Sequence, residues 1–253
     1  MNSSFRSRLK NREPLLGTMV TLSTPAVSEI FAEIGFDWLF IDGEHGPLET
    51  PDLLRILQAV SHRLACVIRV PAASEASIKR TLDIGAAGVI VPMVNTPDQA
   101  ADVVRWSRYS PAGSRGVGLA RAQGYGLRFQ QYVESANDSV AVIVQAEHAL
   151  AVDNIESIVQ VEGIDGVQLG PYDLAASMGK MGQVDDPDVV AAVDHIIATC
   201  LKANVAVGCF AISADAVQSW VERGCTLITA GVDTLLLAGA AGSTLKSLRA
   251  MTK

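Results

Sequence analysis

Residues 82–97 read LDIGAAGVIVPMVNTP and contain the boundary signals of one strand between two helices. Gly85 stands where a helix commonly ends in a left-handed residue. Residues 88–92, GVIVP, are uniformly apolar, which is typical of a strand covered on both faces. Thr96 and Pro97 then pair a capping residue with a proline suited to the first helical turn. The stretch therefore predicts a helix–strand–helix unit of an α/β fold.

The same unit repeats along the chain. Short runs rich in Val, Ile and Leu predict strands at residues 16–22, 38–42, 65–70, 88–92, 140–147, 166–169, 205–210 and 226–230. Helical patterns lie between them, around 25–34, 50–62, 74–84, 96–108, 149–160, 188–203, 213–222 and 232–248. This alternation predicts a parallel sheet, and its count favours closure into a (β/α)8 TIM barrel. An open doubly wound sheet is the alternative, but no glycine-rich phosphate motif follows a strand.

The bulk numbers fit one domain over residues 1–253. Apolar residues make up 49% of the chain and charged residues 19%, enough for a large core. The net charge of −7 argues against nucleic acid and anionic membranes as partners. No apolar run has the length of a membrane span, and the first residues lack the apolar core of a signal peptide. Four cysteines without a CxxC pair indicate reduced thiols and a cytoplasmic location.

One connection, residues 109–139, is too long for a tight barrel. It carries Arg115, Arg121 and Arg128 among several glycines. Its composition suits a flexible surface insertion and equally a lid on the βα side that supplies cations to an anionic ligand. The two interpretations remain open at this point.

Charged and polar side chains gather at the ends of neighbouring predicted strands. In a barrel the active site lies at the carboxyl ends of the strands. Strands two, three, five and six end in charge, whereas strands seven and eight end nearly apolar. The residues concerned are Asp42, Glu44, His45, Arg69, Gln145, Glu147 and Asp173. Their uneven distribution predicts one polar pocket.

Each of these residues admits a structural and a chemical interpretation. Glu147 and Asp173 suit a hard divalent ion, or they cap the following helices. Arg69 suits a carboxylate or an enolate oxygen, or it forms an ion pair with Asp42 or Glu44. The His45 imidazole suits a general base.

No lysine lies within an apolar strand, so the chain lacks the buried amine that a Schiff-base aldolase needs. Carbanion chemistry in this chain would therefore need a metal ion.

Six stretches, in order along the chain, resemble the HpcH/HpaI aldolase family, the metal-dependent class II pyruvate aldolases. They are FDWLFIDGEHGP, VIRVP, LDIGAAGVIVPMV, SRGVG, VQAEHALAVDNIESI and GVQLGPYDLAASMG, and the resemblance runs from about Gly17 to the C-terminus. It implies a (β/α)8 barrel with a C-terminal helix swapped between subunits, in a homohexamer built as a trimer of dimers. It also implies a divalent metal ion (Mg²⁺, Mn²⁺ or Co²⁺) and a role in aromatic compound catabolism.

By motif match, the resemblance assigns residues of this chain to one metal–enolate site. The assignments are Glu147 and Asp173 as metal ligands, His45 as general base, Arg69 as stabiliser of the enolate, Gln145 and the backbone of Tyr172 as substrate contacts, and Asp83 and Asp42 as supports of His45. Asp83 would make His45 more basic near a subunit contact. Tyr172 stands where many members carry a smaller residue, which affects the wall of the pocket.

The implied activity is reversible cleavage of a 4-hydroxy-2-oxoacid to pyruvate and an aldehyde, similar to that of 4-hydroxy-2-oxoheptanedioate aldolase. Alternatives are a 2-dehydro-3-deoxy sugar-acid aldolase, an oxaloacetate decarboxylase side activity, a lyase of the citrate-lyase-β type and a non-catalytic barrel. Succinic semialdehyde, tartronic semialdehyde, lactaldehyde and related hydroxyaldehydes are the candidate aldehydes. The sequence does not choose among them.

Overall fold

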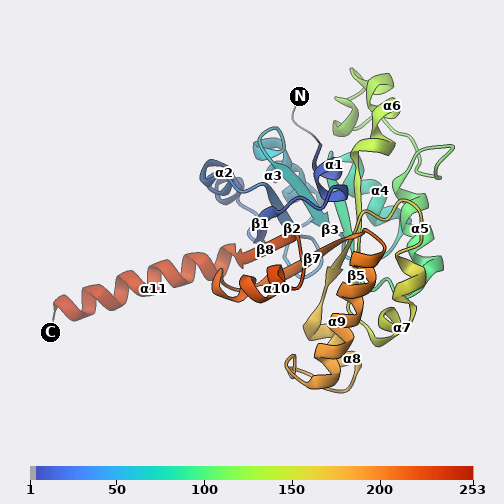
Figure 1. Cartoon of the computed structure of the whole chain (residues 1–253). Helices are drawn as coiled ribbons and strands as arrows, with labels where there is room; N and C mark the ends of the chain where they lie inside the picture. The colour runs from blue at the N-terminus through green and yellow to red at the C-terminus, as the bar shows by residue number, and fades with distance from the viewer. Residues whose placement is uncertain (1–3, 253) are drawn as a thin grey trace.

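The computed structural model describes residues 4–252, which form a closed barrel of parallel strands in the order β1 to β8 (Figure 1). The predicted (β/α)8 barrel is confirmed, and each observed strand lies within two residues of its expected position. The strands are β1 Leu15–Val20, β2 Trp38–Asp42, β3 Ala65–Arg69, β4 Gly88–Val91, β5 Ala141–Ala146, β6 Gly166–Leu169, β7 Ala206–Ala211 and β8 Leu227–Val232. Most positions of these strands are buried, since the barrel interior covers one face and the helices the other.

Helices surround the barrel and connect its strands. The expected ones are α2 Pro25–Ile34, α3 Thr50–Val60, α4 Glu75–Asp83, α5 Pro97–Ser107, α7 Ala149–Ile158, α9 Pro187–Lys202, α10 Gln218–Glu222 and α11 Asp233–Met251. The additional ones are α1 Phe5–Lys10, η1 Arg121–Gln123, α6 Phe129–Ser139, α8 Pro171–Ser177 and η2 Asp215–Val217.

Local sequence signals set many of the boundaries. Gly85, predicted to end a helix, has a positive φ of +94°, and three further glycines that precede strands, Gly35, Gly163 and Gly224, have φ between +99° and +102°. Thr96 begins α5 through a reciprocal pair of hydrogen bonds with Gln99. At α3 the capping residue is Glu49, whose backbone N–H donates to the Asp52 carboxylate at 3.1 Å.

Helix α1 closes the barrel at the amino ends of the strands. Its Leu9 is fully buried and packs with Leu15, Trp38 and other side chains of the lower barrel interior. Arg6 of α1 donates to both carboxylate oxygens of Asp165, at 2.9 and 2.8 Å, just before β6. The open end of the barrel is therefore the one at which the strands finish.

The long connection, residues 109–139, lies on the opposite side from the one expected. It joins the end of α5 to the start of β5, so it belongs to the amino end of the barrel and not to the βα side. It contains η1 and α6 instead of a flexible insertion. Arg121 donates to the carbonyls of Leu57 and Ile84, at 3.0 and 2.9 Å, where α3 and α4 finish. Its arginines thus contribute to this face, away from the carboxyl ends of the strands.

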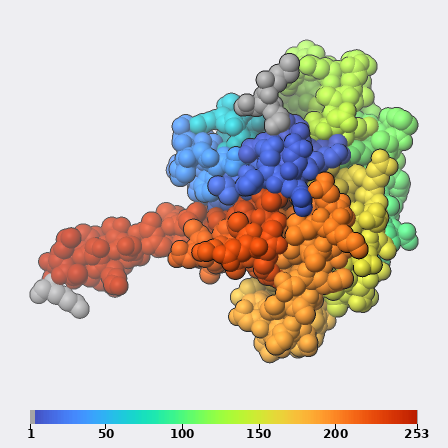
Figure 2. Space-filling model, in the orientation of Figure 1, coloured from blue at the N-terminus to red at the C-terminus, as the bar shows by residue number. Residues whose placement is uncertain are grey.

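Helix α11 projects away from the barrel (Figures 1 and 2). Its large apolar side chains are exposed in this single chain: Leu235, Leu236, Leu237, Leu245, Leu248 and Met251. Among residues 4–252, none of the helices combines the length and apolar character that a membrane crossing requires.

Candidate active site

A buried ion pair joins the ends of β2 and β3. Asp42 and Arg69 are partners in the strand register. The Arg69 guanidinium donates from Nε and Nη2 to the two Asp42 carboxylate oxygens, at 2.9 and 2.8 Å. The same guanidinium lies 5.3 Å from the centre of the Phe40 ring. The ion-pair interpretation of Arg69 is therefore correct, and the pair fixes a cation at the open end of the barrel.

The loop after β2 turns around the same carboxylate. Asp42 Oδ1 also accepts the backbone N–H groups of Glu44 and His45, at 3.1 and 3.3 Å. Glu44 Oε2 lies 3.2 Å from Arg69 Nη1, so Glu44 also pairs with Arg69. The His45 side chain is 71% exposed, and its Nε2 lies 3.8 Å from Glu44 Oε2. The imidazole is thus accessible to a ligand while its backbone is held.

Burial and charge shift the pKa values of these carboxyl groups in opposite directions. Burial alone would raise the pKa of Asp42, but the hydrogen bonds and charge of Arg69 outweigh it and lower the pKa. The pKa of Glu44 is raised by burial, although Arg69 and His45 act against the rise. Asp42 is therefore the more acidic of the two carboxyl groups, and Glu44 is the more readily protonated.

Glu147 is held at the end of β5 by two donors. Its Oε1 accepts the backbone N–H of Met93 at 2.8 Å, and its Oε2 accepts from the Gln145 amide. Met93 adopts a left-handed conformation, with φ of +56°, directly after β4. The helix-capping alternative for Glu147 is wrong, because His148 caps α7 by accepting the N–H of Leu150. The carboxylate is thus oriented toward the barrel mouth.

Gly170, at the end of β6, leaves the space that the Glu147 side chain occupies. A Cβ at this position would lie 2.6 Å from Glu147 Cβ and 2.9 Å from Glu147 Oε2. The Gly170 backbone has φ of −122°, which other residues adopt without strain. The glycine is therefore needed for room and not for its conformational freedom.

Replacing Gly170 with Ala should weaken divalent-cation binding by about 10- to 100-fold, the usual effect of disturbing a residue that orients a ligand. The added methyl would displace the Glu147 carboxylate, which is a candidate ligand. Titration with Mn²⁺ by calorimetry measures the effect, with circular dichroism to confirm folding. Gly118→Ala is the matched control, because a Cβ there meets nothing within 4 Å. Equal affinities in both variants would contradict this role of Gly170.

The charges around Glu147 suit a bound cation. Burial raises the pKa of Glu147, and the nearby Glu44 and Asp173 carboxylates raise it further, against the Met93 N–H. The Oε1 atom of Gln145 is buried and has no hydrogen-bond partner. Within residues 4–252, no group of three His, Cys, Asp or Glu side chains is placed to hold a metal ion. Glu147 and Asp173 would thus supply two ligands, leaving positions for water and an oxygen-bearing substrate.

The remaining predicted site residues occupy different places. Tyr172 lies in the first turn of α8 and is 62% exposed beside Asp173. Asp83, the last residue of α4, lies at the amino end of the barrel and accepts from Arg115 Nη2 at 2.8 Å. The structure of the single chain therefore brings Asp42, His45, Arg69, Gln145, Glu147 and Asp173 to one end of the barrel, but not Asp83.

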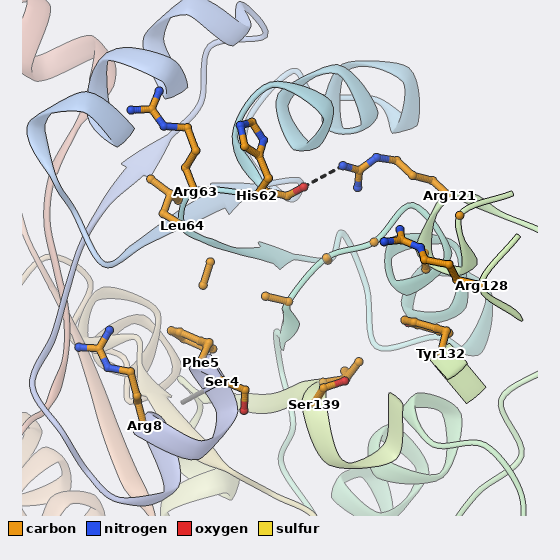
Figure 3. Close-up of a pocket in the computed structure, with 18 of the residues that line it drawn as sticks. Ser4, Phe5, Arg8, His62, Arg63, Leu64, Arg121, Arg128, Tyr132 and Ser139 are labelled. Carbon is orange, nitrogen blue, oxygen red and sulfur yellow. Dashed lines mark hydrogen bonds between the residues drawn. The ribbon is translucent and has the colours of Figure 1, made fainter. Parts of the chain in front are cut away.

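A large cavity lies at the amino end of the barrel, away from these residues. It has a volume of about 1270 Å³, and Figure 3 shows Arg121 and Arg128 on one side of it and Phe5 and Arg8 on the other. Arg8 pairs with Asp37 at 2.9 Å, and Arg63 with Glu33 at 2.7 Å. Most of its cations thus have structural partners.

Two residues of the site were missed by reasoning from the sequence, Met93 and Gly170. Met93 lies just beyond the predicted strand at residues 88–92, and its contribution is a backbone N–H. Gly170 belongs to a matched motif, GPYD, but its role depends on the rotamer of Glu147. No pattern in one sequence reports either fact.

Comparisons with known proteins show the family of the chain. The family model for HpcH/HpaI aldolase/citrate lyase matches residues 16–240. The chain is 41% identical to hydroxypyruvate/pyruvate aldolase of Cupriavidus necator, covering 98% of this chain and 93% of the relative. It is 42% identical to 4-hydroxy-2-oxovalerate aldolase of Rhodococcus jostii, covering 93% and 92%. It is 41% identical to 2-keto-3-deoxy-L-rhamnonate aldolase of Escherichia coli, covering 95% and 91%.

A solved structure supports the same relationship. The crystal structure of an HpcH/HpaI aldolase/citrate lyase family protein from Burkholderia cenocepacia superimposes with a TM-score of 0.92 at 40% identity, covering 96% of this chain and 98% of that one. The family match spans most of the chain, and the relatives are aldolases. This chain therefore belongs to the HpcH/HpaI aldolase/citrate lyase family and is a carbon–carbon lyase of the pyruvate-aldolase class.

Proposed function

We propose that the protein reversibly cleaves a 4-hydroxy-2-oxoacid into pyruvate and an aldehyde. The observation that carries the proposal is the convergence of Asp42, Arg69, Glu147 and the accessible His45 at the open end of the barrel. A general base, a fixed guanidinium and a carboxylate pair suited to a cation are the groups that aldol cleavage through an enolate needs. The aldolase names of the relatives at about 41% identity support the same reaction class.

We propose Glu147 and Asp173 as the ligands of a divalent ion, Mg²⁺, Mn²⁺ or Co²⁺. The donor set is all oxygen, and the excess negative charge around Glu147 would be reduced by a cation. When bound, such an ion would act as a Lewis acid on the keto group of the 2-oxoacid and increase the acidity of the adjacent carbon. Gln145, with its unpartnered Oε1, and the backbone at Tyr172 are the proposed contacts to the pyruvate portion.

The chain's own groups would perform the proton transfers and hold the enolate. In cleavage, His45 accepts the proton of the 4-hydroxyl group as the C3–C4 bond breaks and the aldehyde leaves. The bond electrons form the pyruvate enolate, whose oxygen is stabilised by the positive charge of Arg69. Asp42 supports both residues, because it binds the Arg69 guanidinium and the backbone N–H of His45. Protonation of the enolate at C3 gives pyruvate.

We further propose a homohexamer built as a trimer of dimers, with α11 swapped between subunits. The exposed leucines of α11 and its projection from the barrel support a partner on this helix (Figure 2). Asp83 shares a small pocket with the exposed Tyr125, and Leu119 and Leu127 of the same long connection are exposed apolar side chains. A subunit contact there would allow Asp83 to act on His45 of another copy.

The cytoplasmic location is a proposal supported by the four cysteines, which are all buried and form no disulfide. The proposed role in aromatic compound catabolism rests on the resemblance alone. Among the sequence alternatives, a 2-dehydro-3-deoxy sugar acid gains support from the 2-keto-3-deoxy-L-rhamnonate aldolase relatives. A 4-hydroxy-2-oxoheptanedioate substrate differs from it in producing an aldehyde with its own carboxylate.

Metal removal tests the proposed function directly. Purified protein treated with EDTA and then desalted should release pyruvate from a 4-hydroxy-2-oxoacid at least about 10³-fold more slowly, since Lewis-acid catalysis contributes several kcal/mol. Adding Mg²⁺ or Mn²⁺ should restore the rate, measured by coupling pyruvate to lactate dehydrogenase. Full activity in the stripped protein would refute metal dependence. Absence of pyruvate release with every 4-hydroxy-2-oxoacid tested would instead support a non-catalytic barrel.

A further inference from the structure

We infer that an ordered water lies inside the barrel below the active site, and that Gln168 and Thr229 hold it there to position Gln145. Both would be positioning residues, because they act on the proposed metal ligand Glu147 through the Gln145 amide. The inference rests on the proposed function in one respect, namely that Glu147 binds a divalent ion. It depends on uncharged groups of the barrel interior and not on the charges at the mouth.

Three polar side chains point into the barrel from different strands: Gln145 on β5, Gln168 on β6 and Thr229 on β8. Side chains of a strand alternate between its two faces. The neighbours of these three residues along the chain face outward, since they belong to the apolar cluster that the surrounding helices complete. These neighbours are Val144, Ala146, Val167, Leu169 and Ile228. The three polar side chains therefore face the barrel interior.

These residues form a polar layer between an apolar floor and the charged mouth. The next interior position below Gln145 is Ile143, and the one below Thr229 is Leu227, both in the lower apolar cluster. The next interior position above Gln145 is Glu147. All three polar residues are at most 3% exposed in the isolated chain. The chain itself therefore encloses the polar layer, whatever a second subunit covers at the mouth.

Each side chain of the polar layer has an oxygen without a protein partner. The Oε1 atoms of Gln145 and Gln168 and the Oγ1 atom of Thr229 are buried, and no group of residues 4–252 forms a hydrogen bond to them. The Gln168 amide nitrogen has only a long contact, of 3.4 Å, with the carbonyl of Leu169. Buried polar atoms are almost always hydrogen-bonded, either to protein or to ordered water. Water is therefore the expected partner of these oxygens.

The strand register brings the three groups together. Gln145 and Gln168 are partners on neighbouring strands, so their side chains start about 5 Å apart on the same face. The Gln168 amide extends over β7, because its Oε1 occupies the place that a Cβ of Gly208 would take. The next strand is β8, where Thr229 lies one interior position above Leu227, the partner of Gly208. Gly208 thus leaves the space in which Gln168 approaches Thr229.

Water has the donors and acceptors that these atoms lack. A glutamine Oε1 only accepts hydrogen bonds, whereas a threonine hydroxyl both donates and accepts. A buried water typically makes about three hydrogen bonds. It can donate to the two amide oxygens, of Gln145 and Gln168, and accept from the Thr229 hydroxyl. A 2-oxoacid cannot replace it there, because its carboxylate and keto oxygens only accept, as the amide oxygens do.

The water would fix the amide that orients Glu147. Gln145 Nε2 donates to Glu147 Oε2, and its second hydrogen is available to the pyruvate unit. The reverse orientation of the amide would lose the hydrogen bond from water to Oε1 and place that oxygen against the Glu147 carboxylate. Gln168 and Thr229 therefore keep the amide nitrogen directed toward the proposed metal ligand.

Mn²⁺ affinity tests this role. Gln168→Met and Thr229→Val nearly preserve the size of the side chains and remove their polar atoms. Each should weaken Mn²⁺ binding, measured by calorimetry with MnCl₂, by about 10-fold, the lower end of the effect of partners that orient a metal ligand. Thr229→Ser retains the hydroxyl and should restore the affinity. Ile143→Leu disturbs only the packing of the apolar floor and should bind Mn²⁺ as the unmodified protein does.

A crystal structure of the unmodified protein should show a water within hydrogen-bonding distance of Gln168 Oε1, and the structure of Thr229→Val should lack it. Circular dichroism and thermal unfolding show whether each variant folds. If Gln168→Met does not fold, the comparison of Thr229→Val with Thr229→Ser decides. A residue that only stabilises the fold would change the unfolding temperature and leave the Mn²⁺ affinity of the folded protein unchanged.

Two results would overturn the inference. One is equal Mn²⁺ affinity in Thr229→Val, Thr229→Ser and Ile143→Leu. The other is a crystal structure in which the Gln168 amide bonds directly to protein groups, without water. Failure of the unmodified protein to bind Mn²⁺ would count against the proposed function itself. Normal binding by the unmodified protein, together with equal binding by the variants, counts against the inference alone.

Discussion

Glu147→Gln should lower the rate of pyruvate release by about 10³-fold or more and remove measurable Mn²⁺ binding, while the barrel still folds. The substitution keeps the size of the side chain and retains an oxygen that can accept the Met93 N–H, now at 2.8 Å. What it removes is the negative charge in a buried position where Glu44 and Asp173 already raise the pKa of the carboxyl group. A cation would lose one of its two protein ligands. The protein itself would lose the repulsion between the Glu147 carboxylate and those of Glu44 and Asp173.

The two consequences can be measured separately. Turnover is followed by coupled pyruvate detection, affinity by Mn²⁺ calorimetry and stability by thermal unfolding. We expect activity and affinity to fall together, with stability unchanged or higher because a buried like charge is gone. Asp173→Asn should have the same effect on activity. Glu156→Gln, at an exposed position of α7, is the matched control and should behave as the unmodified protein. Normal turnover in Glu147→Gln would exclude this residue as a metal ligand.

Much of the fold could be predicted because each signal is local. The apolar run of β4 needs no knowledge of its neighbours, and Gly85 has its positive φ of +94° because a helix ends there. Helix α1 was missed because its six residues carry four polar side chains, and only Leu9 reports the barrel interior that it closes. The side on which residues 109–139 lie was wrong for another reason. Its arginines suggested ligand binding, whereas their partners are carbonyls and carboxylates of the same chain.

In the site, too, some features follow from the sequence and others depend on contacts in three dimensions. The adjacency of Asp42 and Arg69 follows from strand order, so their pairing could be expected as one of two interpretations. The orientation of Glu147 could not, because it depends on the left-handed backbone of Met93 and on the missing side chain of Gly170. Both features become visible only when atoms from three strands are placed together. Asp83 marks a further limit, since its proposed effect on His45 requires a second subunit.

His45→Ala should reduce aldol cleavage by about 10²- to 10⁴-fold, the usual range for a positioned general base. The imidazole is 71% exposed at the mouth, and the backbone of His45 is fixed by Asp42 at 3.3 Å. Removing the side chain therefore leaves the loop anchored and the Arg69 pair intact. Mn²⁺ affinity should stay within about threefold of that of the unmodified protein, because His45 is not a proposed ligand.

A second substrate separates a base from a residue that merely shapes the pocket. Oxaloacetate loses CO₂ to give the same pyruvate enolate, but it has no 4-hydroxyl proton to remove. His45→Ala should therefore keep most of any decarboxylation that the protein catalyses while losing aldol cleavage. His195→Ala, at an exposed position of α9, should affect neither reaction. If both reactions fell equally, His45 would act through binding or through the later protonation of the enolate. If cleavage stayed within twofold of normal, another group would have to accept the hydroxyl proton. Glu44 would then be the first residue to substitute, because its pKa is raised and its Oε2 lies 3.8 Å from the imidazole.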